Sequence, residues 1–224
     1  MVVRIAALLV VLLSLFGVAK VPEEVKKTKD AVYNLWVLDE NVMNIICTGI
    51  AIETDEGPAF LSAGHCVSEA PKARYYISQS VDPDMLTRVK LRWWEFEGIE
   101  YWKEGDWALF EMPEGWKGST VPVCKGTPEP GEDVWSWTGP VGMLPILRTG
   151  VYSGEIHFPS NSEYEASLGG MHFVDIEGAP GSSGSGMLRL ENGKVCVWGI
   201  WVGYFDPKPS GAIVYPLPPV IRGQ

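Results

Sequence analysis

Apolar and polar residues alternate along much of this chain, in short runs that end at glycine, proline or asparagine. Runs of this length, rich in valine, isoleucine, tryptophan and tyrosine, are typical of β-strands joined by tight turns. The segment 88–92 (Arg-Val-Lys-Leu-Arg) alternates strictly, which predicts a strand with one buried and one solvent-facing side. No stretch keeps a long helical period. The pattern therefore predicts an all-β chain.

The expected strands fall into two groups, separated by the polar, glycine-containing link 113–119. This link divides the chain into a first half at about 31–118 and a second half at about 119–217, with 31–224 as one domain. A polar, lysine-rich lead-in at 20–30 is expected to form a short helix or an extended segment. The Asn192-Gly193 pair favours a hairpin turn. The expected strands are 32–37, 44–52, 58–62, 74–78, 88–96, 106–112, 121–124, 131–139, 144–153, 170–175, 187–190, 195–202 and 211–217.

The composition is that of a folded globular protein, with 46% hydrophobic and 21% charged residues among 224. Acidic residues number 28 against 18 basic ones, which gives a formal net charge of −10. This excess of negative charge argues against nucleic acid or an anionic membrane surface as the main partner. No set of ligand residues has the spacing of a metal site, and the sequence has no phosphate-binding loop, so no cofactor or metal is expected.

Residues 1–19 have the pattern of a secretory signal peptide, with Arg4, a short apolar core at 5–16 and small residues at 17–19. The apolar core is too short for a comfortable membrane span. We therefore expect cleavage and a secreted or periplasmic location, with an uncleaved membrane anchor as the alternative. Because exported proteins meet an oxidising environment, the four cysteines are candidates for two disulfides.

The segment 178–186 (Gly-Ala-Pro-Gly-Ser-Ser-Gly-Ser-Gly) has no charge and no large side chain. Glycine and proline weaken both helices and strands, so the segment is either a flexible surface loop or a turn that exposes a nucleophile. An acyl-transfer serine needs such a turn, with backbone N–H groups aimed at the developing oxyanion. With Ser183 as nucleophile, the amides of Gly181 and Ser183 are the natural donors. Ser182 and Ser185 are the rival nucleophiles.

All three histidines, His65, His157 and His172, precede Ser183. This order excludes the α/β-hydrolase arrangement, in which histidine follows serine. His65 lies in a small-residue turn after an expected strand, and Asp106 begins another strand, where a buried carboxylate needs a hydrogen-bonding partner. The order histidine, aspartate, serine is that of the chymotrypsin triad. His157 and His172 are expected to be structural or surface residues.

Three motifs then resemble those of the trypsin-like serine proteases. Leu-Ser-Ala-Gly-His-Cys at 61–66 is similar to their T/S-A-A/G-H-C motif, Gly-Asp-Trp-Ala-Leu at 105–109 to their D-x-A-L motif, and Gly-Ser-Ser-Gly-Ser at 181–185 to their G-D/N-S-G-G/S motif. The resemblance runs from about residue 31 to residue 217. It implies two six-stranded antiparallel Greek-key β-barrels, one from each half, with the active site in the cleft between them.

The resemblance implies roles for individual residues. Ser183 is the nucleophile of a serine endopeptidase, His65 its general base and Asp106 the orienting acid, in a monomer that acts on polypeptides. Cys47 and Cys66 match positions that form a disulfide beside the catalytic histidine. Cys124 and Cys196 have no such precedent, and are either paired with each other or both free and buried.

Specificity and activation depend on single positions. Glu177 lies where trypsin-like enzymes carry the acid that selects Arg or Lys, so a substrate pocket of Glu177, Trp201 and Gly203 is one hypothesis, and a solvated Glu177 is the other. Ser182 replaces the aspartate that zymogens use after activation. The chain therefore resembles bacterial-type relatives that need no second cleavage.

Two other functions use the same residues. A protease-like binding module would keep the motifs without turnover, and an esterase would use the same triad on a different substrate. The 10 tryptophans also invite a carbohydrate-binding interpretation, but most lie within expected strands, which favours core packing.

Overall fold

The computed structural model describes residues 20–68, 70–96, 105–139, 142–156, 170–205, 211–218 and 221–222. The predicted signal peptide and His157 lie outside this part of the chain. Strands dominate it, as the pattern predicted, and each expected strand is present. The elements are α2 (Glu23–Lys27), η1 (Thr28–Ala31), β1 (Val32–Asp39), β2 (Val42–Thr54), β3 (Gly57–Ser62), α3 (His65–Ser68), β4 (Arg74–Ser78), η2 (Pro83–Met85), β5 (Thr87–Phe96), β6 (Asp106–Glu111), β7 (Val121–Pro122), β8 (Asp133–Thr138), β9 (Ile146–Glu155), β10 (His172–Asp175), β11 (Gly186–Glu191), β12 (Lys194–Phe205) and β13 (Gly211–Pro216).

Barrel one is built by the first half of the chain. Its strands follow the order β1-β4-β5-β6-β3-β2, and antiparallel pairing of β1 with β2 closes it. The β1–β2 hairpin turns at Glu40 and Asn41, whose positive φ angles of 45° and 75° match the twist of a tight hairpin. Short β7 then pairs with β2 in parallel, which leads the chain out toward the second barrel.

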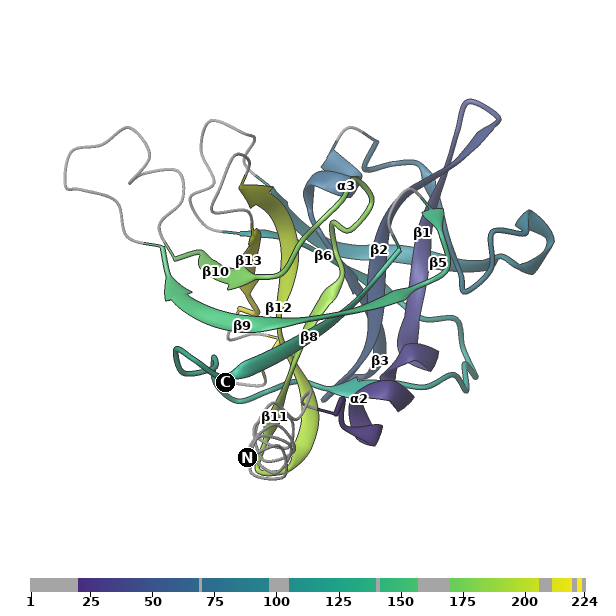
Figure 1. Cartoon of the computed structure of the whole chain (residues 1–224). Coiled ribbons are helices and arrows are strands. Elements are labelled where there is room, and N and C mark those ends of the chain that lie inside the picture. Colours follow the sequence, from purple (N-terminus) through teal and green to yellow (C-terminus); the bar gives the residue numbers. More distant parts are fainter. Residues whose placement is uncertain are drawn as a thin grey trace, which may run out of the picture.

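Barrel two is built by the second half, in the closed order β10-β13-β12-β11-β8-β9. The hairpin predicted at Asn192-Gly193 joins β11 to β12, with φ angles of 53° and 77°. Figure 1 shows the two barrels side by side, with α3 between their upper ends. The expected fold class, two six-stranded antiparallel barrels, is confirmed.

Each barrel has its own apolar centre, and a third cluster joins them. Barrel one is filled by aromatic rings, with Phe60 and Phe110 at a centroid separation of 5.7 Å and Tyr75 packed on Phe110 at 5.4 Å. Barrel two is filled around Trp198 and Tyr152. The joining cluster contains residues from both halves, which makes the contact between the barrels part of the hydrophobic core.

The lead-in at 20–30 forms the helical turns α2 and η1 and closes one end of this contact. Val25 is fully buried, and its carbonyl accepts a hydrogen bond from the Trp137 indole N–H at 3.1 Å. The lead-in is thus helical, which settles the choice left open by its composition. Within the described residues, no helix is long and apolar enough to span a bilayer.

Candidate active site

His65 begins the short helix α3, three residues after β3 ends at Ser62. Ala63 is fully buried, and the next residues turn tightly, with the amides of Cys66 and Val67 bonded to the carbonyls of Ala63 and Gly64. The buried strand therefore fixes the start of the turn. The imidazole remains accessible, with 30% of the side chain exposed.

Asp106 is the first residue of β6 and is 1% exposed. Its Oδ1 accepts the backbone N–H of His65 at 2.8 Å, and its Oδ2 lies 2.7 Å from His65 Nδ1. These two contacts offset the cost of burying a carboxylate. Because Nδ1 faces the carboxylate, the neutral ring carries its proton there, which leaves Nε2 as the basic nitrogen.

Tyr75 supports the helix of His65 from inside barrel one. Its hydroxyl donates to the carbonyl of Ala70 at 2.6 Å, close after α3, and lies 3.5 Å from the carbonyl of Val67. Burial raises the pKa of the Tyr75 phenol to about 12. The hydroxyl therefore stays a donor, and α3 stays anchored, over the pH range in which proteins are usually studied.

The segment 178–186 is not a free surface loop, because it folds into two tight turns against barrel one. The amide of Ser182 bonds to Ala179 O at 3.0 Å and that of Ser185 to Ser182 O at 3.1 Å. Gly184, at φ 82°, is required: a Cβ there would lie 2.2 Å from both Ser62 Oγ and the Thr48 carbonyl. This close approach packs the segment 178–186, which we call the serine loop, against the end of β3, three residues before His65.

The three serines of this loop differ in exposure. Ser182 is 2% exposed and Ser185 is 0% exposed, whereas Ser183 is partly exposed. A nucleophile must meet its substrate, so burial argues against both rivals of Ser183. The family resemblance already favoured Ser183 over its two rivals, and the difference in exposure agrees with that choice.

The backbone amides of residues 181–185 also fall into two groups. Those of Ser182, Gly184 and Ser185 donate to backbone carbonyls within the loop or to Trp201. For the amides of Gly181 and Ser183, no backbone acceptor is found in the part of the chain that the structure describes. These are the two amides expected to bind an oxyanion.

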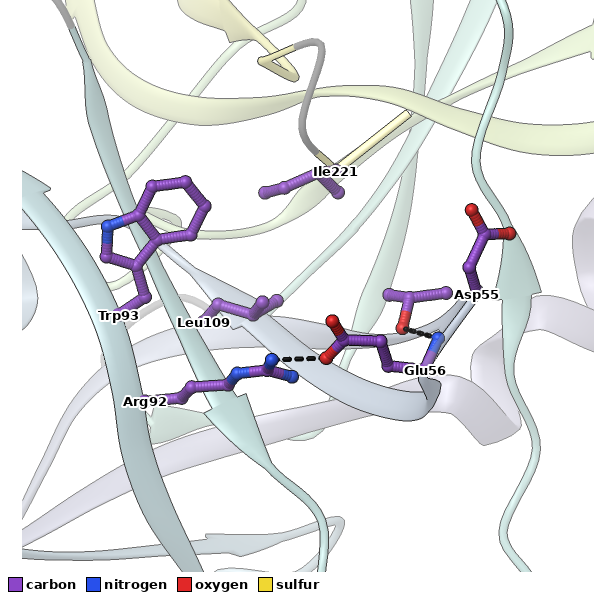
Figure 2. A pocket seen from close by; sticks show the side chains of 7 residues that line it. Asp55, Glu56, Arg92, Trp93, Leu109 and Ile221 are labelled. Carbon is purple, nitrogen blue, oxygen red and sulfur yellow. Dashed lines mark hydrogen bonds and ion pairs between the residues drawn. The ribbon is translucent and has the colours of Figure 1, made fainter. Parts of the chain in front are cut away.

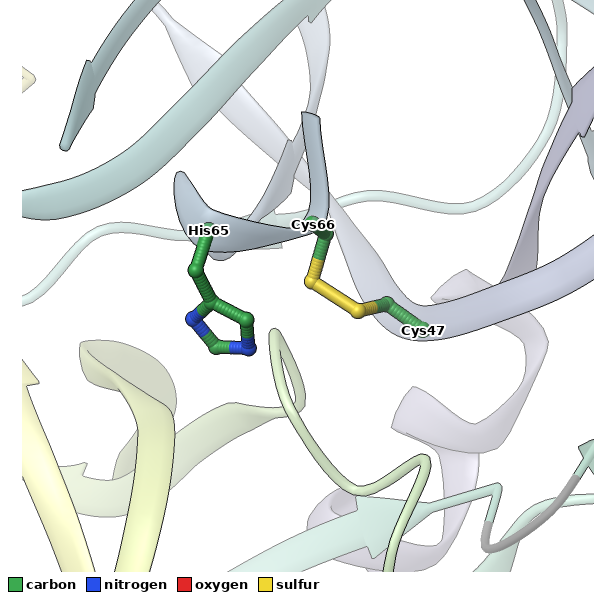
Figure 3. A group of neighbouring side chains, drawn as sticks. All are labelled: Cys47, His65 and Cys66. Carbon is green, nitrogen blue, oxygen red and sulfur yellow. A yellow bond between two sulfur atoms is a disulfide. The ribbon is translucent and has the colours of Figure 1, made fainter. Parts of the chain in front are cut away.

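The structure brings both expected cysteine pairs to disulfide distance, Cys47 with Cys66 and Cys124 with Cys196. Figure 3 shows the first pair beside the imidazole of His65, which points away from α3. The ligand atoms of Cys47, Cys66 and His65 lie within 4.8 Å of one another, a grouping that could hold a metal ion. However, both sulfurs are joined in the disulfide and His65 Nδ1 faces Asp106, so this grouping offers no thiolate ligand.

The residues of the predicted specificity pocket differ in burial. Trp201 is buried, and its indole lies against Gly178, where a Cβ would be 2.4 Å away. Glu177 is exposed and Gly203 is partly buried. The exposure of Glu177 fits the solvated-loop hypothesis better than a carboxylate at the base of a pocket.

The second described histidine, His172, lies on β10 of barrel two. It is 8% exposed, and its Nδ1 lies 2.5 Å from the hydroxyl of Tyr152. Its ring packs edge-on against Trp198 at 5.8 Å. The expectation of a structural role fits these contacts.

A pocket of about 170 Å³ lies elsewhere on barrel one (Figure 2). An ion pair between Arg92 and Glu56 closes one side, and the ring of Trp93 forms another. The pocket contains none of the candidate site residues, and Leu109 is the one motif residue in its lining. Its lining is Thr54, Asp55, Glu56, Arg92, Trp93, Leu109 and Ile221.

Sequence reasoning gave no role to Thr48, which the structure places under the serine loop. Its hydroxyl donates to the carbonyl of Gly181 at 2.8 Å, and its backbone N–H to the carbonyl of Ser183 at 3.0 Å. The only sequence signal was its position next to Cys47. Contacts across 133 residues of chain leave no local pattern that could have revealed them.

No protein-family model and no curated protein sequence matches this chain. Solved structures do match it. The Rv3671c protease from M. tuberculosis, in its active form, aligns with a TM-score of 0.66 and 17% identity over 90% of this chain and 82% of that one. Its inactive form aligns with a TM-score of 0.64 and 16% identity over 90% of both chains. Deg5 aligns with a TM-score of 0.62 and 17% identity, over 89% of this chain and 90% of its own. At this identity the likeness establishes the fold, which is the two-barrel fold of such proteases.

Proposed function

We propose that this protein is a serine endopeptidase that uses His65, Asp106 and Ser183. The observation that carries the proposal is the two-point contact between Asp106 and His65 beside a loop in which only one serine is accessible. A protease fold supports it, since the matched Rv3671c structures are named as a protease. The packing of the loop at Gly184 against Ser62, three residues before His65, supports a site that the histidine, the aspartate and the serine share.

In the first half of the reaction, Ser183 Oγ attacks the peptide carbonyl while its proton moves to Nε2 of His65. Asp106 holds the ring and stabilises its positive charge. The N–H groups of Gly181 and Ser183 bind the oxyanion. When the intermediate collapses, the C–N bond breaks, the amine leaves with the proton from His65, and Ser183 carries the acyl group.

In the second half, His65 removes a proton from water, whose oxygen attacks the acyl carbon. The bond to Ser183 Oγ breaks, the serine regains its proton from His65, and the carboxylic acid leaves. The reaction needs no cofactor, because the proton carrier and the oxyanion donors are all supplied by the chain.

We propose that the enzyme is exported and that removal of residues 1–19 is the only processing it needs. Two cysteine pairs at disulfide distance fit an oxidising compartment. Ser182, at the position of the zymogen aspartate, is buried, and its hydroxyl accepts the amide of Ala179 at 3.4 Å. The loop thus has a local partner where a zymogen needs a new N-terminus. A preference for basic side chains at Glu177 stays a hypothesis.

The test is labelling of purified mature protein with a fluorophosphonate probe. Wild type should be labelled, Ser183→Ala and His65→Ala should not, and Ser185→Ala should behave as wild type because its hydroxyl is buried. Peptide and ester substrates then separate an endopeptidase from an esterase. A folded wild type without labelling or turnover would contradict the proposal and favour a binding module.

A further inference from the structure

Thr48, on β2 of barrel one, is fully buried and is hydrogen-bonded to the serine loop of barrel two. It makes four hydrogen bonds, and each group able to bond is used. Its N–H donates to Ser183 O at 3.0 Å and its hydroxyl donates to Gly181 O at 2.8 Å. The same hydroxyl accepts the amide of Gly139 at 3.0 Å, and its carbonyl accepts Ser62 Oγ at 2.7 Å.

The two loop carbonyls that Thr48 binds belong to the residues of the candidate oxyanion donors. Gly181 and Ser183 are the two residues whose amides are proposed to bind the oxyanion, and both give their carbonyl to Thr48. Each fixed carbonyl also fixes the plane of its peptide unit. The N–H of Ser183 belongs to the unit between these two fixed planes, and the N–H of Gly181 belongs to the unit directly before the first, so both donors adjoin a peptide plane that Thr48 holds. Gly181, at φ 90°, lies in a backbone region with few steric restraints of its own, so its orientation depends on this outside contact.

A hydroxyl is needed at this position because the contact has two directions. It gives a hydrogen to the loop of barrel two and takes one from Gly139, which follows β8. Valine has the shape of threonine but can do neither, and it would leave the buried amide of Gly139 and the partly buried carbonyl of Gly181 without this partner. The space is tight as well, since a Cβ on Gly139 would lie 2.9 Å from Thr48 Oγ1. Serine keeps both bonds with less volume.

We propose that Thr48 is a positioning residue that sets the direction of the oxyanion donors, and that it links the geometry of the serine loop to that of the histidine turn through Ser62. The inference rests on the proposed function. Thr48 touches neither substrate nor the reacting atoms, and it acts through Gly181 and Ser183. Because such donors stabilise charge that develops only in the transition state, their displacement lowers kcat and leaves KM nearly unchanged.

The experiment compares Thr48→Val with Thr48→Ser and with a matched control, Thr28→Val. Thr28 is also buried, and its hydroxyl donates to the Val25 carbonyl at 2.7 Å, away from the serine loop. We expect Thr48→Val to lower kcat on a peptide substrate about 10- to 100-fold with KM within about threefold, below the loss of a whole donor. Affinity for a peptide aldehyde, whose adduct places an oxygen in the same site, should fall in parallel. Thr48→Ser should restore most of both, and Thr28→Val should change neither.

A Thr48→Val protein that melts cooperatively and keeps kcat within twofold of wild type would overturn the inference. So would a Thr28→Val variant with the same loss of kcat, because the effect would then be general destabilisation. If wild type shows no turnover, the proposed function fails. Amide hydrogen exchange then tests separately whether the hydrogen bonds of Thr48 hold the loop at Gly181 and Ser183, a contact that we call the clamp. Thr48→Val should then speed exchange at Gly184 and Ser185 at least about tenfold relative to β12 core amides. Unchanged exchange at these two amides would also overturn it.

Discussion

The two barrels hold the same three components, a disulfide, a histidine and a hydrogen-bonded partner of that histidine, yet they place them differently. In barrel one, His65 bonds to a carboxylate and remains partly exposed at the contact with the serine loop. In barrel two, His172 bonds to the Tyr152 hydroxyl and is buried against Trp198.

The difference lies in what each partner does to a positive charge. A carboxylate next to the ring stabilises an imidazolium, so His65 can take up a proton during a reaction. The phenol of Tyr152 carries no such negative charge, and His172 is buried at 8% exposure, out of reach of a substrate. The residue type alone therefore does not decide the role of a histidine. The charge of its partner and its access to solvent do.

The two disulfides also differ in place, one beside the candidate site and the other in the core of barrel two. Cys47–Cys66 closes a separation of 19 residues and joins β2 to α3 next to the imidazole. Cys124–Cys196 closes a separation of 72 residues and belongs to the core of barrel two. One bridge holds the candidate site, and the other holds the connection between the barrels onto β12.

The largest expected contrast comes from removing the two histidine partners. Asp106→Asn should keep one oxygen for the His65 amide but present the wrong group to Nδ1, and should lower kcat by about 10⁴. Tyr152→Phe should leave kcat within about twofold and lower the free energy of unfolding by roughly 1 kcal/mol. Steady-state kinetics and urea unfolding measure both. An equal loss of kcat in the two variants would break the distinction between the barrels.

The two disulfides should differ both in stability and in activity. In the chain-entropy picture the separations of 19 and 72 residues correspond to about 3 and about 4 kcal/mol of unfolding free energy. The double variant Cys124→Ala/Cys196→Ala should therefore unfold more readily than Cys47→Ala/Cys66→Ala. Only the latter should lose kcat while still folded, because its bridge lies beside His65. Denaturant unfolding with parallel kinetics decides this, and a kcat loss confined to the barrel-two variant would reverse the assignment.

The smallest effect concerns Tyr75, whose pKa burial raises to about 12. The folded state holds this proton more tightly than the unfolded state, whose tyrosines titrate near pH 10. The contribution of this proton to the free energy of unfolding is therefore complete below about pH 10, and it declines as the pH rises from about 10 to 12. Tyr75→Phe should cost roughly 1 kcal/mol at pH 8 through the lost bond to Ala70, and its stability should fall less steeply above pH 10.

Urea unfolding of both proteins at pH 8 and at pH 10.5 measures the change. If the free energy of unfolding falls equally in wild type and in Tyr75→Phe between the two pH values, this phenol does not contribute to the loss of stability at high pH. Since Tyr75 anchors α3 from inside barrel one, a fall in kcat that accompanies the loss of stability would further indicate that the helix of His65 depends on this contact.

Much of the architecture could be predicted from local patterns. Strand segments depend on alternation and on turn residues, which neighbouring positions in the chain carry, so the hairpin at Asn192-Gly193 and the all-β class followed directly. The order of His65, Asp106 and Ser183 also stands in the sequence, and it predicted the contact between His65 and Asp106 that the structure contains.

Other features depend on residues that are distant in the chain and could be decided only by the tertiary structure. Burial separates Ser183 from Ser182 and Ser185, although all three share one glycine-rich run. The pairing of Cys124 with Cys196 depends on how the link between barrels lies on β12. The clamp by Thr48 depends on barrel one reaching the serine loop across 133 residues. A local pattern records which residues can form a strand or a turn, whereas burial and long-range hydrogen bonds exist only after the two barrels have packed together.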